Sequence, residues 1–312
     1  MYKSEGLVEQ HFHGAFGIDF MKCTANDIVD VSVEILKYGV TRIYPTLMTD
    51  DIGVIKEQIG KVRKAMEKQP EKSAKISGIH LEGPFINPEK SGIHEKKYIL
   101  PPTLENYLKI EDEVIKIVTL APELDSNGEL SEYLRQKGVR VSCGHSLAAD
   151  LPLCDCVTHL FNAMGGITHK SKNTATSALI NDEIYTEVIA DGNHIIPDVL
   201  KLIFRTKPLD KIILISDALP STCSGESECD FAGQKVYLKN GAFYSANGIL
   251  GGSGMLVLQI IQKLLRDKLI KSPQNAFKMA SSNINSYMCI LNNGFVEWDN
   301  DFNIINTEIC KY

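Results

Sequence analysis

Histidines and carboxylates stand at the ends of short apolar runs along this chain, and these residue types can bind a metal ion. His11 and His13 are two apart in a run with strand character, so their side chains leave the same face and can contact one cation. Such a pair often arises by chance, but four further residues follow similar runs: Glu82, His145, His159 and Asp217. Imidazole and carboxylate ligands together suit Zn²⁺, Fe²⁺, Mn²⁺ or Ni²⁺. The sequence therefore predicts a divalent metal site.

Asp217 allows two interpretations. It directly follows the apolar run IILIS at 212–216, where an aspartate often serves as a turn or cap residue. Next to metal-bound water, the same carboxylate would be a general base that takes a proton from the nucleophile and returns it to a leaving amine. The five other possible metal ligands at the ends of similar runs favour the second interpretation, in which Asp217 is a general base.

The elements that would position these residues alternate between strands and helices. Eight runs are typical of β-strands, and seven segments between or after them have a helical pattern, which indicates βα units around a parallel sheet. The predicted strands cover 6–13, 40–46, 76–82, 115–121, 139–143, 156–161, 185–190 and 211–216. The predicted helices cover 26–37, 51–68, 103–110, 128–137, 175–181, 197–204 and 254–268.

Two architectures fit this alternation, a (β/α)8 barrel like that of triosephosphate isomerase and a doubly wound open sheet. Barrel enzymes place their chemistry at the carboxyl ends of several strands. Because the polar residues of this chain recur at such ends from the first strand to the eighth, we expect the α/β barrel.

The segments outside this alternation lead to further expectations. Glycines at 248–254 are expected to open the helix predicted at 254–268, whose free backbone N–H groups could contact an anion. The small polar residues at 220–230 predict an exposed loop. A helix at 276–287 and two short strands at 294–298 and 302–309 follow. His80, within a strand-like run, is expected to be packed behind the site.

Composition excludes several classes of protein. The 312 residues include 33 Lys and Arg against 39 Asp and Glu, a net charge of −6, which gives no sign of a nucleic-acid groove or a membrane-binding surface. No apolar stretch approaches the roughly 20 residues that span a bilayer. Without a signal-peptide pattern at the start and with eight irregularly spaced cysteines, we expect a cytoplasmic protein with reduced thiols. The pairs Cys154/Cys156 and Cys223/Cys229 lack the CxxC spacing of a zinc ribbon.

Seven sequence words, in this order, resemble a known family. They are HFHGAFGIDF at 11–20, HLEGPFINPEKSGIH at 80–94, GHS at 144–146, THLFNAM at 158–164, ADGNH at 190–194, ISDA at 215–218 and LGGSG at 250–254. This pattern is similar to that of the N-acetylglucosamine-6-phosphate deacetylases of the amidohydrolase superfamily. The resemblance implies metal-dependent hydrolysis of the acetamide of N-acetylglucosamine 6-phosphate to acetate and glucosamine 6-phosphate.

The resemblance also implies roles for individual residues. Glu82, His145 and His159 would hold one metal, and His11 and His13 could hold a second together with Glu82 and Asp217. Asp217 would be the general base and acid, and His94 would help to polarise the acetamide carbonyl. The sugar phosphate would be bound by His94 and by a set of three further residues: Asn162, Ala163 and His194.

The sequence departs from the family pattern in two places. Lys170 stands where the resemblance implies a phosphate-binding arginine, and lysine keeps the charge but loses the bidentate contact. Lys172 or His169 could compensate, or could be solvated loop residues. Few residues precede the first barrel strand, so the accessory β-sandwich of the family is expected to be reduced or missing, with the barrel at 1–290 and a β remnant at 291–312.

Several alternatives follow from these departures. The resemblance implies that the phosphate site is completed across a dimer interface, so we expect a homodimer that acts on a small amino-sugar phosphate and binds neither nucleic acid nor membrane. A related amidohydrolase that acts on another amide or amino-sugar is the first alternative. A sugar-phosphate-binding protein without catalysis is the second, although such a protein would not need Asp217 or the His11/His13 pair.

Overall fold

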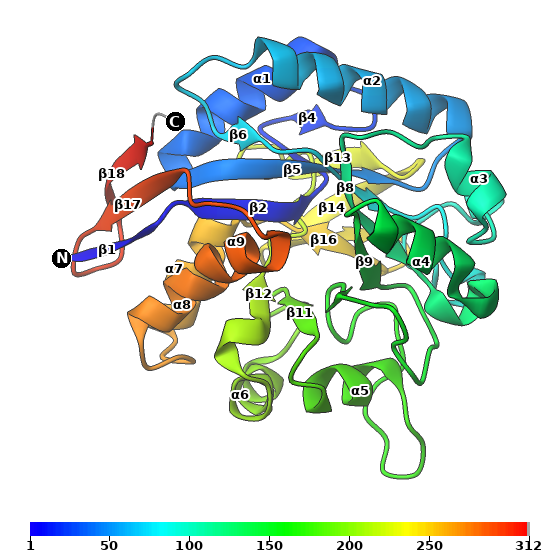
Figure 1. The fold of residues 1–312 in the computed structure, drawn as a ribbon. Coiled ribbons are helices and arrows are strands. Elements are labelled where there is room, and N and C mark those ends of the chain that lie inside the picture. The colour runs from blue at the N-terminus through cyan, green and yellow to red at the C-terminus, as the bar shows by residue number, and fades with distance from the viewer. Residues whose placement is uncertain (311–312) are drawn as a thin grey trace.

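A curled sheet of eight parallel strands forms the centre of the protein (Figure 1). The computed structural model describes residues 1–310 of the chain. Each strand pairs with the next one in chain order, which is the pattern that repeated βα units produce. The strands are β2 (Leu7–Phe12), β5 (Val40–Met48), β7 (Ile79–Glu82), β8 (Ile115–Leu120), β9 (Arg140–Cys143), β10 (Cys156–Val157), β11 (Tyr185–Val188) and β12 (Ile212–Leu214), with the short β6 (Lys75–Ile76) beside β5.

The eight strands lie in the eight regions that the sequence predicts, although β10 is shorter than expected. The carboxyl ends of the first and last strands meet, because two main-chain hydrogen bonds join His11 and His13, at the end of β2, to the segment beyond β12. Asp217 N donates to His11 O at 2.9 Å, and His13 N donates to Ala218 O at 2.8 Å. These bonds bring Asp217 next to the two histidines of the first strand.

Helices surround the sheet, and their apolar faces pack against it (Figure 1). In α2, for example, Asp51 caps the first turn by accepting from Gly53 N at 2.8 Å, and Ile55, Ile59 and Val62 recur at helical spacing on the buried face.

No helix among residues 1–310 is both long and apolar enough to cross a membrane. The helices are α1 (Ala25–Glu34), α2 (Ile52–Lys68), α3 (Leu104–Leu108), α4 (Glu129–Gln136), α5 (Thr174–Ile180), α6 (Pro197–Thr206) and α7 (Val257–Arg266). Short 3-10 helices are η1 (Ile35–Tyr38), η2 (Pro88–Lys90), η3 (Lys96–Tyr98), η4 (Pro122–Leu124), η5 (Ser126–Gly128) and η6 (Leu209–Lys211).

An antiparallel sheet between the eighth strand and α7 differs from the prediction. Its strands are β13 (Glu228–Phe231), β14 (Gln234–Lys239), β15 (Ala242–Ser245) and β16 (Leu250–Ser253). The glycines at 248–254 were expected to open a helix, but β16 occupies 250–253 and α7 begins at Val257. A Cβ on Gly252 would lie 2.6 Å from Asp217 O, so glycine allows this strand to approach Asp217 closely. The predicted loop at 220–230 likewise ends in β13. Near the start of the chain, β3 (Gly14–Ala15) and β4 (Ile18–Asp19) form a small hairpin after β2.

The two ends of the chain share a second antiparallel sheet (Figure 1). Strand β1 (Tyr2–Glu5), which the sequence did not predict, pairs with β17 (Gly294–Trp298), and β17 pairs with β18 (Ile304–Ile309), as expected for the two C-terminal strands. Trp298 is buried and stacks on Phe277 at 4.5 Å between ring centroids. The helix predicted at 276–287 is two helices, α8 (Pro273–Met279) and α9 (Ser282–Met288). Of the predicted remnant at 291–312, the last two residues lie outside the described residues.

Candidate metal centre

The six predicted metal-binding residues converge at the carboxyl end of the curled sheet. His11 lies in β2 and His13 directly after it, and Glu82 is the last residue of β7. The other three lie two or three residues beyond the ends of β9, β10 and β12: His145, His159 and Asp217. All six are buried, and all except His11 line a cavity of about 230 Å³. Parallel strands place their carboxyl ends on one face, which explains why residues so distant in sequence meet here.

Glu82, His145 and His159 form the first group of possible ligands. Glu82 Oε1 lies 3.1 Å from His145 Nε2 and 2.9 Å from His159 Nε2, and the two Nε2 atoms are 3.1 Å apart. Donors at about 2.0–2.1 Å from a tetrahedral zinc ion are about 3.3 Å from one another. The three atoms are therefore spaced as ligands of one ion.

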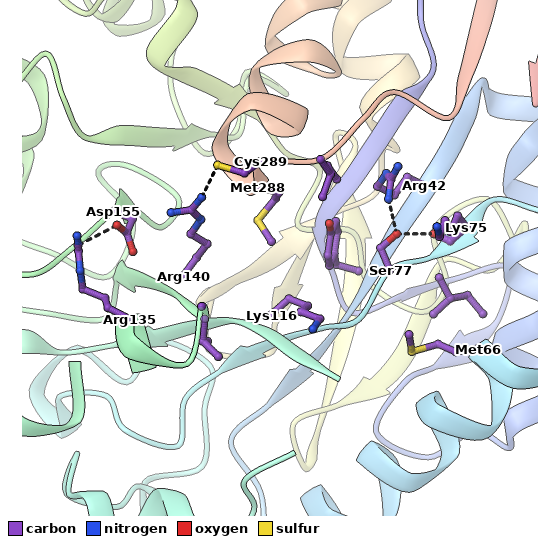
Figure 2. A pocket seen from close by; sticks show the side chains of 15 residues that line it. Arg42, Met66, Lys75, Ser77, Lys116, Arg135, Arg140, Asp155, Met288 and Cys289 are labelled. Atoms are coloured by element: carbon purple, nitrogen blue, oxygen red, sulfur yellow. Dashed lines mark hydrogen bonds and ion pairs between the residues drawn. The ribbon is translucent and has the colours of Figure 1, made fainter. Parts of the chain in front are cut away.

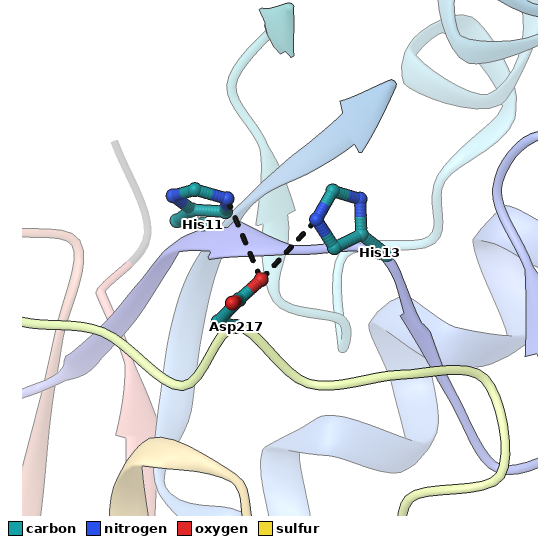
Figure 3. Close-up of side chains that lie close together, drawn as sticks. All are labelled: His11, His13 and Asp217. Carbon is teal, nitrogen blue, oxygen red and sulfur yellow. Dashed lines mark ion pairs between the residues drawn. The ribbon is translucent and has the colours of Figure 1, made fainter. Parts of the chain in front are cut away.

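His11, His13 and Asp217 form the second group (Figure 3). Asp217 Oδ1 lies 3.6 Å from His11 Nε2 and 3.2 Å from His13 Nε2. Glu82 joins this group as well, with Oε1 at 3.5 Å from His11 Nε2 and Oε2 at 3.2 Å from His13 Nε2. Its carboxylate is therefore placed between the two groups.

The orientation of the imidazoles leaves lone pairs free for a cation. His11 Nδ1 lies 3.0 Å from Glu187 Oε2, and His145 Nδ1 lies 2.7 Å from Lys90 O. These acceptors assign the proton of each ring to Nδ1 and leave Nε2 without one. His11 Nε2 is buried and has no hydrogen-bond partner in the described chain. A buried nitrogen without a partner that faces carboxylate oxygens fits the role of a metal ligand.

The electrostatics of the centre also favour a cation. Burial alone would raise the pKa of Asp217, but the hydrogen bond from His13 and the charges of His11 and His13 outweigh it and lower this pKa well below its ordinary value. Burial alone would lower the pKa of His13, yet its contacts with Asp217 and Glu82 raise it to about 9. The carboxylates therefore stabilise protonated histidines in this site. A divalent ion would supply the same positive charge in place of those protons.

The main chain at three of these residues lies in the left-handed region. The φ angles are 48° at His145, 28° at His159 and 52° at Asp217. Residues other than glycine rarely adopt such angles, and they persist where surrounding structure holds them. Around His145, Glu123 provides such support, because Ser146 Oγ donates to its Oε2 at 2.6 Å and Leu147 N donates to its Oε1 at 2.6 Å.

His94 lies beside the metal groups and has a neutral ring. Burial, followed by the charge of His145, lowers its pKa to about 4. Thr49 Oγ1 is 2.8 Å from His94 Nδ1, and Glu82 Oε2 is 3.4 Å from His94 Nε2. If Thr49 donates its hydroxyl proton to Nδ1, the proton of the ring is on Nε2, directed toward the metal centre.

The predicted substrate-binding residues divide into two sets. Asn162, Ala163 and His194 line the cavity together with His94. His194 Nδ1 is 2.8 Å from Asp191 Oδ2, so Asp191 fixes the orientation of that ring. Lys170 is exposed and is not among the residues that line the cavity, and the same holds for His169 and Lys172. Lys172 instead pairs with Asp150.

Two residues with roles at this site, Glu187 and Thr49, were missed by the sequence reasoning. Asp191 lies in the ADGNH motif at 190–194 that the sequence analysis singled out, but it was assigned no role there. Glu187 Oε2 accepts from His11 Nδ1 and from His159 N at 3.3 Å, and Glu187 Oε1 accepts from Gln10 Nε2 at 2.7 Å. Glu187 is a charged residue in the middle of the strand-like run 185–190, and this position could have marked it as a candidate for the site. His80 is packed as expected, with Nε2 at 2.7 Å from Thr119 Oγ1 and Nδ1 at 3.2 Å from Gln10 O.

Comparisons with known proteins point to one family. The chain is 34% identical over 260 residues to N-acetylglucosamine-6-phosphate deacetylase of Bacillus subtilis, an alignment that covers 80% of this chain and 66% of the relative. It is 33% identical over 278 residues to the enzyme of the same name from Mus musculus, with 80% and 65% covered. The chain thus spans just under two thirds of the length of these relatives. The crystal structure of the Thermotoga maritima protein of that name superposes with a TM-score of 0.89 at 25% identity, over 98% of this chain and 87% of the other. No protein-family model matches the chain.

Proposed function

This chain belongs to the N-acetylglucosamine-6-phosphate deacetylase family of the amidohydrolase superfamily, and on that premise we propose that it hydrolyses the acetamide of N-acetylglucosamine 6-phosphate. The products are acetate and glucosamine 6-phosphate. The observation that carries this proposal is the convergence of two ligand groups on Glu82, beside the neutral His94, in one buried cavity.

The proposed cofactor is one or two divalent ions per subunit, with Zn²⁺ as the first candidate and Fe²⁺, Mn²⁺ or Ni²⁺ as alternatives. Glu82, His145 and His159 would hold one ion, and His11, His13 and Asp217, together with Glu82, would hold a second. When bound, the ion polarises the amide carbonyl and makes water acidic enough to react near neutral pH.

Asp217 is the proposed proton carrier of the reaction. Its low pKa keeps the carboxylate ionised, so it can accept a proton from the attacking water. The same proton then passes to the nitrogen of the acetamide as the C–N bond breaks, and glucosamine 6-phosphate leaves as an amine. One buried carboxylate thus serves first as base and then as acid.

His94 is the proposed donor to the acetamide oxygen. With its Nδ1 accepting from Thr49, the ring presents Nε2–H to the cavity, where negative charge develops on the carbonyl oxygen. A pKa of about 4 means that His94 acts as a neutral hydrogen-bond donor rather than as an acid at neutral pH.

Asn162, Ala163 and His194 are proposed to bind the sugar, and Lys170 is proposed to bind the phosphate in place of an arginine. Because Lys170 is exposed in the single chain, we propose that the phosphate site is completed in a homodimer. We also propose a cytoplasmic protein, a complete (β/α)8 barrel at 1–290 and a remnant of an accessory β-sandwich at 291–312.

A second candidate is a deacetylase of another amino-sugar or amide. The observation that favours it is the position of Lys170, which stands where the family has an arginine but does not line the cavity. The cavity therefore lacks the side chain that was expected to select a phosphorylated sugar. A non-catalytic sugar-phosphate-binding protein is the remaining alternative, and the shared position of Asp217 and His94 in the cavity disfavours it.

Acetate release tests these proposals. The protein is stripped of metal with a chelator, resupplied separately with Zn²⁺, Mn²⁺ or Fe²⁺, and assayed with N-acetylglucosamine 6-phosphate and with N-acetylglucosamine. Metal-dependent release from the phosphorylated sugar alone supports the deacetylase proposal. Release from both sugars shows that the phosphate is not required and leaves the true substrate open. Release from neither contradicts hydrolysis of N-acetylglucosamine 6-phosphate and favours the second candidate or the non-catalytic binding protein.

A further inference from the structure

Glu9 is a buried carboxylate close to the metal centre that metal binding does not explain. It lies in β2, two residues before His11, and is fully buried. Within residues 1–310 it belongs to none of the groups that could hold an ion, and it does not line the catalytic cavity. A buried carboxylate is costly unless hydrogen bonds satisfy its oxygens. The partners of Glu9 therefore indicate what it does.

The two oxygens of Glu9 have different partners. Oε1 accepts from Val257 N at 2.7 Å, and Val257 is the first residue of α7. The first N–H groups of a helix have no partner within the helix, so this carboxylate satisfies one of them. Oε2 accepts from Ser216 Oγ at 2.8 Å, and Ser216 is fully buried and directly precedes Asp217. Glu9 therefore links the strand of the two histidines to the residue before Asp217.

The hydroxyl of Ser216 spans the turn that carries Asp217. Its oxygen donates to Glu9 and accepts from Ala218 N at 3.3 Å, so it is bonded on both sides of Asp217. The turn needs support, because Asp217 has a φ of 52°, which residues other than glycine rarely adopt. At the main chain, Asp217 N donates to His11 O at 2.9 Å. The Glu9–Ser216 contact adds a side-chain link from β2 to the same turn.

We propose that Glu9, acting through Ser216, is a positioning residue for Asp217. This inference rests on the proposed deacetylase function, in which the carboxylate of Asp217 takes a proton from water and passes it to the leaving amine. Such a carboxylate must stay within hydrogen-bond distance of both groups, and a misplacement of about 1 Å can cost about 10²-fold in rate. Glu9 does not line the cavity, so it acts on the position of Asp217 and not on the reacting atoms.

Ser216→Ala breaks the link and leaves Glu9 in place at the start of α7. At saturating Zn²⁺, we expect kcat for acetate release from N-acetylglucosamine 6-phosphate to fall about ten- to a hundredfold, because Asp217 loses its support. KM should stay within about twofold of wild type, since Asn162 and His194, which are proposed to bind the sugar, lie on other segments. A purely structural role would lower the unfolding free energy without this split between kcat and KM.

Two substitutions of Glu9 separate geometry from charge. In Glu9→Gln the amide oxygen can accept from Val257 N and the NH₂ group can donate to Ser216 Oγ, so both links persist in neutral form. We expect this variant to keep kcat within about threefold of wild type. Glu9→Leu places a side chain of similar size there without a hydrogen-bonding group. It should lower kcat as much as Ser216→Ala does.

Ser77→Ala is the matched control for the loss of a serine hydroxyl. Ser77 Oγ accepts from Arg42 Nη1 at 2.7 Å at the amino ends of the strands, opposite the metal centre, and Figure 2 shows this contact. The substitution also takes a hydroxyl partner from a charged side chain, but kcat should remain at its wild-type value.

Asp217→Asn supplies a second comparison, because a positioning residue has no effect once the carboxylate that it positions is gone. Adding Ser216→Ala to Asp217→Asn should change the residual rate by less than about twofold. An independent role of Ser216 would instead lower both rates by the same factor.

Zinc binding gives a readout that does not depend on the reaction. Competition with a chromogenic chelator should show that Ser216→Ala binds one Zn²⁺ about tenfold more weakly than Ser77→Ala does, as expected for loss of an outer partner of a ligand. If wild type releases no acetate, the proposed function fails, and this titration still decides the inference. Equal Zn²⁺ affinity of the two variants would then overturn it.

If wild type does release acetate, three results would overturn the inference. The first is an equal kcat of Ser216→Ala and Ser77→Ala. The second is an equal fractional loss on adding Ser216→Ala to wild type and to Asp217→Asn. The third concerns Glu9 itself: wild-type kcat in Glu9→Leu, or a loss in Glu9→Gln as large as that in Glu9→Leu.

Discussion

Glu187 offers the sharpest test of how the fold prepares the metal centre. This buried carboxylate accepts three hydrogen bonds, from Gln10 Nε2, His11 Nδ1 and His159 N. Two of these donors belong to the predicted ligands themselves. Glu187→Gln removes the negative charge and keeps the volume, so the effect of charge on the metal groups can be measured without opening a cavity.

The size of the effect follows from these contacts. In Glu187→Gln the amide oxygen can still accept from His11 and His159, and Gln10, whose Oε1 is buried without a partner, can rotate its amide to accept from the new NH₂ group. All donors stay satisfied, and the loss is that between a charge-assisted and a neutral hydrogen bond, about 1–1.5 kcal/mol. We therefore expect about tenfold weaker Zn²⁺ binding, at the lower end of the range for partners of metal ligands.

Competition with a chromogenic chelator measures the Zn²⁺ dissociation constant of each stripped variant. Glu183→Gln, which removes an exposed carboxylate just before the same strand, is the matched control and should bind Zn²⁺ like wild type. Urea unfolding of the metal-free proteins reports whether the fold is preserved. Glu187→Ala is less informative, because it leaves three buried donors unpaired at about 1–3 kcal/mol each.

Wild-type Zn²⁺ affinity in Glu187→Gln, with the fold preserved, would refute the reasoning. It would mean that the negative charge of Glu187 does not strengthen metal binding through its contacts with His11 and His159. If Glu187→Gln and Glu183→Gln both weakened Zn²⁺ binding by the same factor, the effect would come from the net charge of the protein and not from the contacts of Glu187.

Three further predictions follow from other parts of the structure. Asp217→Asn should lower the rate of acetate release by about 10²–10⁴-fold, with metal analysis showing that the Glu82 group keeps its ion; an unchanged rate contradicts the proton-carrier assignment. Burial lowers the pKa of Lys207 from 10.5 to about 8, so the unfolded chain binds more protons between these pH values and folding stability should rise with pH across that window. The free energy of unfolding of wild type minus that of Lys207→Met should therefore increase by on the order of 1–2 kcal/mol between pH 7.5 and 10, and a flat difference in urea unfolding would exclude the shift. Trp298→Ala should cost about 3–5 kcal/mol of unfolding free energy, because the ring is buried against Phe277; a loss below about 1 kcal/mol would mean that the terminal sheet is not packed there.

The amino-acid sequence by itself determined the eight central strands and the polar residues at their ends. Both follow from local information, since strand periodicity and apolar runs are readable within a few residues. Once the strands are parallel and consecutive, their carboxyl ends meet on one face. This is why His11 and Asp217 could be assigned to one site without knowledge of any contact between them.

The tertiary structure alone decided which groups orient those residues. Glu187 contacts His11 across 176 positions of the chain, and His94 depends on Thr49 across 45. It also decided that the glycines near Gly252 form a strand beside Asp217 rather than a helix start, and that β1 pairs with β17. Such pairings depend on which distant segments pack together, and local periodicity carries no information about them. The sequence therefore determined where the chemistry lies, whereas the packing of distant segments decided how each side chain is held there.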